Sequence, residues 1–304
     1  MDVLTHTVVA VTIGMAGFKR WGRRGVLGLV AAANLPDLER VISLGSSAAW
    51  LKVMYGAGHS LMLAPVWGLL LAALLARWLR DRKTAATITG LGVGSHVALD
   101  LVSGPGVRLF WPISSQLYGW RLMARYDLLT LGWLGLMLLG PRLLNLVNRD
   151  MGAKPSSPRP AALVGLAGVA LLVAVRVVAM GLLEGRTQGT LVPSALSPLT
   201  WYAVADAGAA YTIDEVTPWG YGVSLRFRKP QPNRAFETAA DTPLGQAFLE
   251  LAQFPQFSLE PGDRGMLVRI RDLRFYSPAG QGKEWSVEIE VTPQLQVVSQ
   301  RARM

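Results

Sequence analysis

The chain contains three histidines among 304 residues, and each lies in a short polar motif within apolar sequence. The motifs are Asp2-Val-Leu-Thr-His6, Gly56-Ala-Gly-His59-Ser60 and Gly94-Ser-His96-Val-Ala-Leu-Asp100. Imidazole is the commonest metal ligand in proteins, and it also titrates near neutral pH. Ionisable side chains are costly in lipid-embedded sequence, so their presence there indicates function. We therefore interpret the three histidines as residues that carry chemistry.

Two of the histidines have a carboxylate four residues away. Asp100 follows His96 on a predicted helix and Asp2 precedes His6, so the two side chains of each pair share one helical face. Such a pair can chelate one ion, or its carboxylate can orient the imidazole by accepting a hydrogen bond from the ring nitrogen that does not bind the ion. It can equally form a hydrogen bond at a helix end. Two such pairs together with His59 favour metal binding.

Two further carboxylates are candidate metal ligands. Asp37 follows Pro36 at a predicted helix break, where its side chain can bridge ions or accept a proton from water. A Pro-Asp pair is also common in ordinary turns. Asp127 begins a predicted helix, where it is either a ligand or a negative charge that favours the helix N-terminus.

Three arginines, Arg108, Arg121 and Arg125, lie in the loop formed by residues 103–126. Guanidinium groups match phosphate oxygens, so these side chains can clamp a phosphate during catalysis. A loop that binds lipid headgroups explains them equally well. Arg176 lies inside the last apolar segment, and we expect its side chain to snorkel outward.

The composition indicates a membrane protein, because 51% of the residues are hydrophobic and only 16% are charged. Soluble domains carry about 25% charged residues. Residues 1–183 have a net charge of +11, whereas residues 184–304 have a net charge of −1. An excess of basic residues in the apolar half of the chain indicates basic loops on the cytoplasmic side of a membrane. It does not indicate a surface that binds nucleic acid. The absence of cysteine excludes disulfides, thiolate metal sites and cysteine nucleophiles.

Apolar segments occupy residues 3–18, 26–35, 61–76, 84–102, 128–147 and 161–183. Because a span needs about 20 residues, we expect the later three or four to be transmembrane helices. Basic clusters at residues 19–24, 77–83 and 142–159 fall on one side if all six segments cross, and this side is the cytoplasm. The histidines and carboxylates described above then gather near the outer side of the membrane.

The C-terminal part of the chain has a different pattern. Residues 186–198 contain prolines and are predicted to be a linker. Segments 223–228, 267–275 and 285–291 alternate apolar and polar residues, which is typical of β-strands. The predicted fold is therefore a mainly α, polytopic membrane domain at residues 1–185, followed by a small β-rich (α+β) extracytoplasmic domain at residues 199–304.

These motifs together resemble the YdjM-like family. The resemblance is carried by Thr5-His6, Pro36-Asp37-Leu-Glu39, Gly56-x-x-His59-Ser60, His96-x-x-x-Asp100, Gly104, Gly106, Pro112 and Asp127. Members are inner-membrane proteins described as metal-dependent hydrolases, some of them LexA-regulated, and the order of motifs is similar to that of zinc-dependent phospholipase C. The resemblance implies a bacterial inner-membrane location and a metal site formed by His6, Asp37, His59, His96, Asp100 and Asp127.

We therefore predict a membrane-bound hydrolase that uses a divalent metal, zinc above all, to cleave a phosphoester in a lipid or envelope component. Asp37 and the three loop arginines are its predicted catalytic residues. Two alternatives stay open. One is a non-catalytic membrane protein, with a structural ion or with proton or metal transport. The other is a degenerate enzyme kept as a scaffold, because Met54-Tyr55-Gly56 replaces the His-Arg-Gly of many members.

Overall fold

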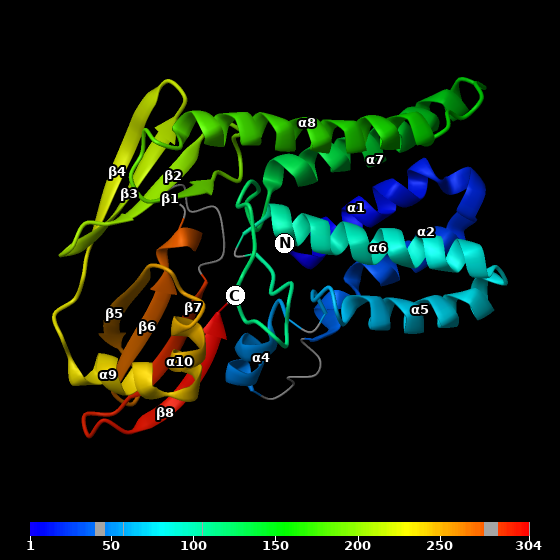
Figure 1. Ribbon diagram of the computed structural model, residues 1–304. Coiled ribbons are helices and arrows are strands. Elements are labelled where there is room, and N and C mark those ends of the chain that lie inside the picture. Colours follow the sequence, from blue (N-terminus) through cyan, green and yellow to red (C-terminus); the bar gives the residue numbers. More distant parts are fainter. Residues whose placement is uncertain (40–45, 57, 105, 277–284, 304) are drawn as a thin grey trace. The chain divides into compact units, whose positions relative to one another are not determined.

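The computed structural model describes residues 1–39, 46–56, 58–104, 106–276 and 285–303 (Figure 1). The chain divides into two compact units. The first, which we call the helical unit, comprises residues 1–39, 55–181 and 193–199. The second, which we call the β-rich unit, comprises residues 40–54, 182–192 and 200–304.

Helices dominate the first unit. They are α1 (Val3–Ala16), α2 (Phe18–Asn34), the 3-10 turn η1 (Pro36–Leu38), α5 (Ala64–Leu79), α6 (Arg82–Val102), α7 (Leu128–Asp150) and α8 (Arg159–Leu183). By length and composition α6, α7 and α8 can cross a membrane, whereas α1 and α5 are apolar but shorter. The expectation that the later apolar segments are the best candidate spans is confirmed.

Apolar side chains also cover the outer surfaces of these helices. Leu69 of α5 is 72% exposed and Leu171 of α8 is 65% exposed, and many neighbouring leucines and valines are similarly uncovered. A surface of this size is unfavourable in water, but it suits contact with lipid. The helical unit is therefore built to lie in a bilayer.

Four helices share an apolar core. Its buried side chains come from α1, α2, α5 and α6 and are Ala10, Leu29, Ala33, Leu75, Ala85 and Ile88. Helix α2 kinks at Gly22, whose φ of 63° is easily adopted only by glycine. It ends at Asn34, directly before the turn that begins with Pro36, as the sequence predicted. This break positions the Asp37 turn beside the core.

The loop between α6 and α7 has its own backbone pairing. Val107 pairs with Tyr118 in an antiparallel bridge, and Ser103 pairs with Met123 in a parallel one. The amide of Leu61 donates to the carbonyl of Leu109 over 2.9 Å. This arginine-bearing loop is therefore held against the segment that contains His59.

The β-rich unit contains two four-stranded antiparallel sheets. The first comprises β1 (Thr190–Pro193), β2 (Trp201–Asp206), β3 (Ala210–Thr217) and β4 (Gly220–Arg228). The second comprises β5 (Pro255–Pro261), β6 (Met266–Asp272), β7 (Ser286–Val291) and β8 (Val297–Arg303). The three segments that the period-two pattern predicted overlap strands β4, β6 and β7, so the β-rich prediction is confirmed, whereas the other five strands were not predicted individually.

Short helices accompany the second sheet. Helices α9 (Arg234–Asp241) and α10 (Pro243–Leu249) pack on β7 (Figure 1). Helix α4 (Ser47–Val53) packs on α10 and so belongs to this unit, although its sequence lies within the range predicted as the membrane domain. The 3-10 turn η2 (Leu273–Phe275) follows β6.

The segment predicted as a linker is structured. Its residues 190–193 form strand β1, and residues 193–199 belong to the helical unit. The amide of Leu129 in α7 donates to the carbonyl of Ala195 over 3.3 Å. The prolines thus lie in a structured segment that connects the two units. Strand β1 is too short for an alternation of apolar and polar residues to reveal it.

Arg176 does not snorkel, and that prediction is wrong. Its side chain is fully buried and forms an ion pair with the buried carboxylate of Asp127. It also donates to the carbonyls of Leu122 and Ser194, at 3.2 and 3.1 Å. A buried guanidinium is tolerated when a carboxylate and further acceptors surround it. Asp127 also accepts from the amide of Thr130 at 2.9 Å, so it caps α7.

Breaking this pair should destabilise the helical unit. We expect Arg176→Met to lower the unfolding free energy in mixed detergent micelles by roughly 3–5 kcal/mol, because the carboxylate of Asp127 is left buried and unpaired. The double variant with Asp127→Asn should lose clearly less than the two single losses added together. An unchanged unfolding free energy for Arg176→Met would show that the pair has no structural role.

Candidate metal centre

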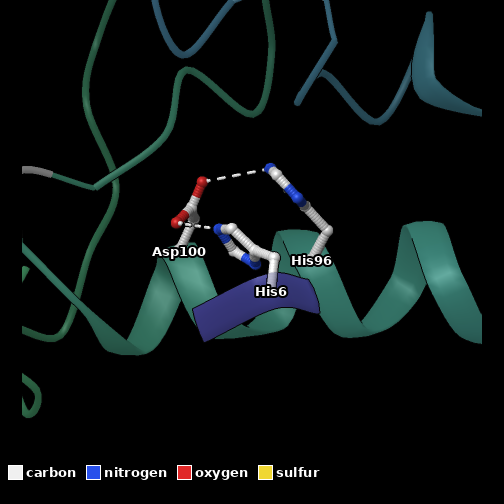
Figure 2. Close-up of side chains that lie close together, drawn as sticks. All are labelled: His6, His96 and Asp100. Carbon is white, nitrogen blue, oxygen red and sulfur yellow. Dashed lines mark ion pairs between the residues drawn. The ribbon is translucent and has the colours of Figure 1, made fainter. Parts of the chain in front are cut away.

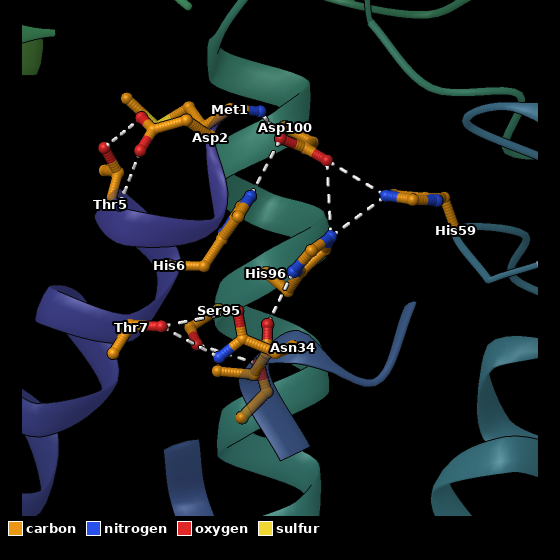
Figure 3. Close-up of polar contacts among 12 residues, drawn as sticks. Met1, Asp2, Thr5, His6, Thr7, Asn34, His59, Ser95, His96 and Asp100 are labelled. Atoms are coloured by element: carbon orange, nitrogen blue, oxygen red, sulfur yellow. Dashed lines mark hydrogen bonds and ion pairs between the residues drawn. The ribbon is translucent and has the colours of Figure 1, made fainter. Parts of the chain in front are cut away.

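Four buried side chains from three separate segments meet in the helical unit (Figures 2 and 3). His6 comes from α1, and His59 comes from the loop before α5. His96 and Asp100 lie one turn apart on the same face of α6 (Figure 2). None of the four is more than 2% exposed. The spacing of His96 and Asp100 therefore places both at the point where His6 and His59 arrive.

The ligand atoms of these side chains are close together. Nε2 of His59 lies 2.9 Å from Nε2 of His96 and 3.0 Å from Oδ2 of Asp100. Nε2 of His96 lies 3.4 Å from the same oxygen, and Nε2 of His6 lies 3.2 Å from Oδ1. Ligands held tetrahedrally at about 2.0–2.1 Å from zinc are roughly 3.3 Å apart. The spacing of the four groups therefore matches that of ligands around a small cation.

The tautomer of His96 is set by α2. Its Nδ1 lies 2.6 Å from the backbone carbonyl oxygen of Ala33. A carbonyl oxygen only accepts hydrogen bonds, so the proton of the neutral ring is on Nδ1. Nε2 then carries a lone pair that points at His59 and Asp100. Such a bond from the distal nitrogen is the usual support of a metal-ligating histidine.

His59 has a corresponding partner in Glu39. Nδ1 of His59 lies 3.4 Å from Oε1 of Glu39, a carboxylate that is only 5% exposed. The same carboxylate accepts from the amides of Tyr55 and Gly58, at 2.6 and 2.9 Å. Glu39 thus fixes the loop and favours the proton on Nδ1 of the ring. Nδ1 of His59 makes no hydrogen bond among the described residues, so Nε2 carries the lone pair only when the proton is on Nδ1.

When both rings carry their proton on Nδ1, acceptors face each other. Two imidazole lone pairs and the carboxylate of Asp100 converge within hydrogen-bond distance, and the neutral rings have no proton to place between them. Buried acceptors in this arrangement repel each other. A cation among them removes the repulsion, so the donor set fits a metal ion.

Asp37 and His6 extend the cluster. Asp37, His59 and His96 offer ligand atoms that all lie within 4.8 Å of one another, and so do His6, His96 and Asp100. The ring of His6 stacks on that of His96, with centroids 3.7 Å apart. The amino group of Met1 also contacts Asp100 (Figure 3). The two overlapping ligand sets share His96.

Two glycines allow the segments to approach this closely. A Cβ atom on Gly92 of α6 would lie 2.5 Å from Cβ of Ala32, so only glycine lets α2 bring the Ala33 carbonyl to His96. A Cβ atom on Gly58 would overlap the carbonyl of Pro36, so glycine lets the His59 loop lie on the Asp37 turn. Asn34 ties α2 to α1 by donating to Thr7 at 3.1 Å (Figure 3).

Residues 1–183 match the family model described as YdjM inner membrane protein. The chain belongs to the YdjM family. The family resemblance read from the motifs is thereby confirmed, and with three candidate spans the protein is an inner-membrane protein. All four clustered residues fall inside the matched region, whereas the β-rich unit lies mostly beyond it. No curated protein and no solved structure matches the chain.

The structure gives two carboxylates of this YdjM-family chain other roles. Asp127 pairs with Arg176 and caps α7, and it is in neither ligand set of the described residues. Asp2 caps α1 by accepting from the amide of Thr5 at 3.1 Å. Sequence spacing suggested a pair between Asp2 and His6, but the side chain of Asp2 turns to the helix start instead (Figure 3).

Glu39 is the site residue whose role the sequence did not reveal. Its only signal was its place two residues after Asp37 in the motif that carried the family resemblance. Among the predicted arginines, Arg108 is buried and its amide donates to the carbonyl of Tyr55 at 2.7 Å. The guanidinium of Arg125 lies over the ring of Tyr126, 5.7 Å from its centroid. Phosphate binding by these arginines and by Arg121 stays a prediction.

The close approach at Gly92 can be tested by stability. We expect Gly92→Ala to lower the thermal midpoint in detergent by several degrees, because its Cβ has no space beside Ala32. Gly90→Ala is the matched control on the same helix, because a Cβ there meets nothing within 4 Å. It should leave the midpoint unchanged or raise it slightly, since alanine favours helix over glycine. Equal midpoints for the two variants would contradict the packing argument.

Proposed function

We propose that this chain is a membrane-bound, metal-dependent hydrolase of a phosphoester in a lipid or envelope component. The observation that carries the proposal is the pair of Nε2 atoms of His59 and His96, 2.9 Å apart beside Asp100, with Nδ1 of His96 hydrogen-bonded to the Ala33 carbonyl and Nδ1 of His59 3.4 Å from Glu39. His6 completes a set of three imidazoles and one carboxylate. Nitrogen and oxygen ligands without thiolate favour zinc, with other divalent ions as substitutes.

The residues around the ion have separate roles in this proposal. His6, His59, His96 and Asp100 would hold it, while Glu39 and the Ala33 carbonyl would orient the rings of His59 and His96. When bound, zinc supplies a hydroxide nucleophile near neutral pH and stabilises negative charge on a phosphoryl oxygen. Asp37 is half-buried and within reach of the cluster, so it can accept the proton of the attacking water.

The reaction is hydrolysis with water as the only co-reactant. The water oxygen forms a bond to phosphorus, the bond from phosphorus to the leaving alcohol breaks, and the leaving oxygen takes up a proton. Arg108, Arg121 and Arg125 lie on the loop that is hydrogen-bonded to the His59 segment. Their guanidinium groups are suited to neutralise the phosphate oxygens.

The proposed orientation places the β-rich unit outside the cytoplasm, and it rests on the three basic clusters between apolar segments. Reporter fusions after residue 150 and at the C-terminus test it. We expect a cytoplasmic signal for the first fusion and a periplasmic signal for the second. Signals from the same compartment would contradict the orientation.

The 2.9 Å distance between the Nε2 atoms of His59 and His96 also favours a second candidate function. A proton shared between the two Nε2 atoms would also remove their repulsion, as in a proton-moving or non-catalytic membrane protein. A structural metal ion without catalysis is the related possibility. Metal content and hydrolysis together separate these functions from the proposed one.

Metal analysis of the purified full-length protein tests the ligand set. We expect at least one zinc ion per chain, and less than a tenth of that amount in His96→Ala and in Asp100→Asn. The matched control is Asp81→Asn, because Asp81 is the exposed cap at the other end of α6 and should not affect zinc. Stoichiometric zinc that survives both changes would exclude these residues as ligands.

Hydrolysis of bis(4-nitrophenyl) phosphate separates an enzyme from a structural site. We expect zinc-dependent turnover by the wild type, and a loss of at least a hundredfold in Asp37→Asn with zinc content retained. A protein that binds zinc without hydrolysing this ester or a long-chain phospholipid would favour the structural-ion alternative.

A further inference from the structure

A groove with a volume of about 590 Å³ lies between α5 and α6. Three of its lining residues have polar side chains, namely His59, Ser60 and Thr89. All other lining residues are glycine, alanine, valine, leucine or proline. The groove is therefore an apolar space that reaches one of the proposed metal ligands.

The α6 wall of the groove is one continuous helical face. Its members recur every three or four residues, from Ala86 through Thr89, Gly90, Val93, Gly94, Val97 and Ala98 to Leu101. At 1.5 Å per residue this face is about 22 Å long. One leaflet of a bilayer contributes about 15 Å of hydrocarbon, half of its core thickness. The groove is therefore long enough for one hydrocarbon chain of a lipid.

Gly90 and Gly94, the two glycines on this face of α6, are not needed for close packing against another helix. A Cβ atom on Gly90 or on Gly94 would meet nothing within 4 Å, unlike one on Gly92 between them, which would clash with α2. Glycine destabilises a helix relative to alanine, and here no close contact requires it. What these two residues provide is open space along the helix.

His59 marks where a ligand's polar end would lie. His59 is fully buried, and it is both a lining residue and a member of the proposed metal centre. Thr89 is 3% exposed and lies near the Ala86 end of the groove, away from His59, so it does not mark the polar end. A peptide occupant would bring backbone amides that three polar side chains cannot satisfy. A hydrocarbon chain with one polar end fits the lining better.

We infer that the α5–α6 groove binds one acyl chain of the lipid substrate and presents the ester of its headgroup to the His59 end. This inference rests on the proposed function for the reacting group, but the chain-binding part stands on the groove itself. Leu69 both lines the groove and is exposed on the outer surface of α5, so a chain can enter sideways from the bilayer.

Photolabelling tests the chain-binding part. The full-length protein is placed in phosphatidylethanolamine and phosphatidylglycerol vesicles that contain phosphatidylglycerol with a diazirine midway along one acyl chain. We expect labels concentrated on the groove-lining peptides of α5 and α6. Gly94→Leu should reduce them at least fivefold, because its side chain fills open space. Gly132→Leu in α7 is the matched control, since a Cβ there also meets nothing within 4 Å.

Either of two results would overturn the inference. One is equal labelling of all apolar helices, which indicates surrounding lipid only. The other is groove labelling that Gly94→Leu and a second variant, Gly90→Leu, leave unchanged while the protein stays folded. The wild-type labelling pattern decides the question even if both variants misfold.

Activity distinguishes a failure of this inference from a failure of the proposed function. We expect Gly94→Leu to slow hydrolysis of long-chain phosphatidylglycerol at least tenfold and to leave that of bis(4-nitrophenyl) phosphate unchanged. Equal slowing of both substrates would overturn the groove's role in substrate binding. If the wild type hydrolyses neither ester, the proposed function fails, and the labelling pattern still decides whether the groove holds a chain.

Discussion

Two imidazole rings have their Nε2 atoms 2.9 Å apart in a buried site, and the Ala33 carbonyl fixes the tautomer of one of them, His96. Asp100 adds a carboxylate to the same point. In water such groups would separate or take up protons, but here their positions are set by the packing of helices in an apolar unit. This crowding of buried nitrogen and oxygen atoms is the constraint on which the proposed metal and the proposed hydrolytic chemistry rest.

The fold sustains this arrangement through backbone contacts and very small residues. Gly92 lets α2 bring a carbonyl to His96, and Glu39 holds the His59 loop by accepting from two amides while lying 3.4 Å from Nδ1 of His59. Glycines on the other face of α6 have the opposite effect and leave a groove open. Helix α6 thus has one face that packs closely on α2 and another that borders the groove. His96 and Asp100 lie between these two faces.

Local spacing predicted part of the site, and long-range partners decided the rest. Helical periodicity predicted that His96 and Asp100 share one face, and the apolar segments predicted where the helices lie. Asp127 could not be assigned in the same way, because its partner Arg176 lies 49 residues further along the chain. The sequence shows that both are charged in apolar surroundings, but not that they neutralise each other. The role of Glu39 was hidden for the same reason, since Tyr55, Gly58 and His59 meet it only in three dimensions.

X-ray absorption at the zinc edge of the purified full-length protein tests the central claim most directly. The account predicts a first shell of nitrogen and oxygen atoms at about 2.0–2.1 Å, with the outer-shell scattering of two or three imidazole rings. His59→Ala should remove one ring from that pattern. A zinc shell without imidazole scattering, or one that His59→Ala leaves unchanged, would contradict the claim that the buried histidines hold the metal.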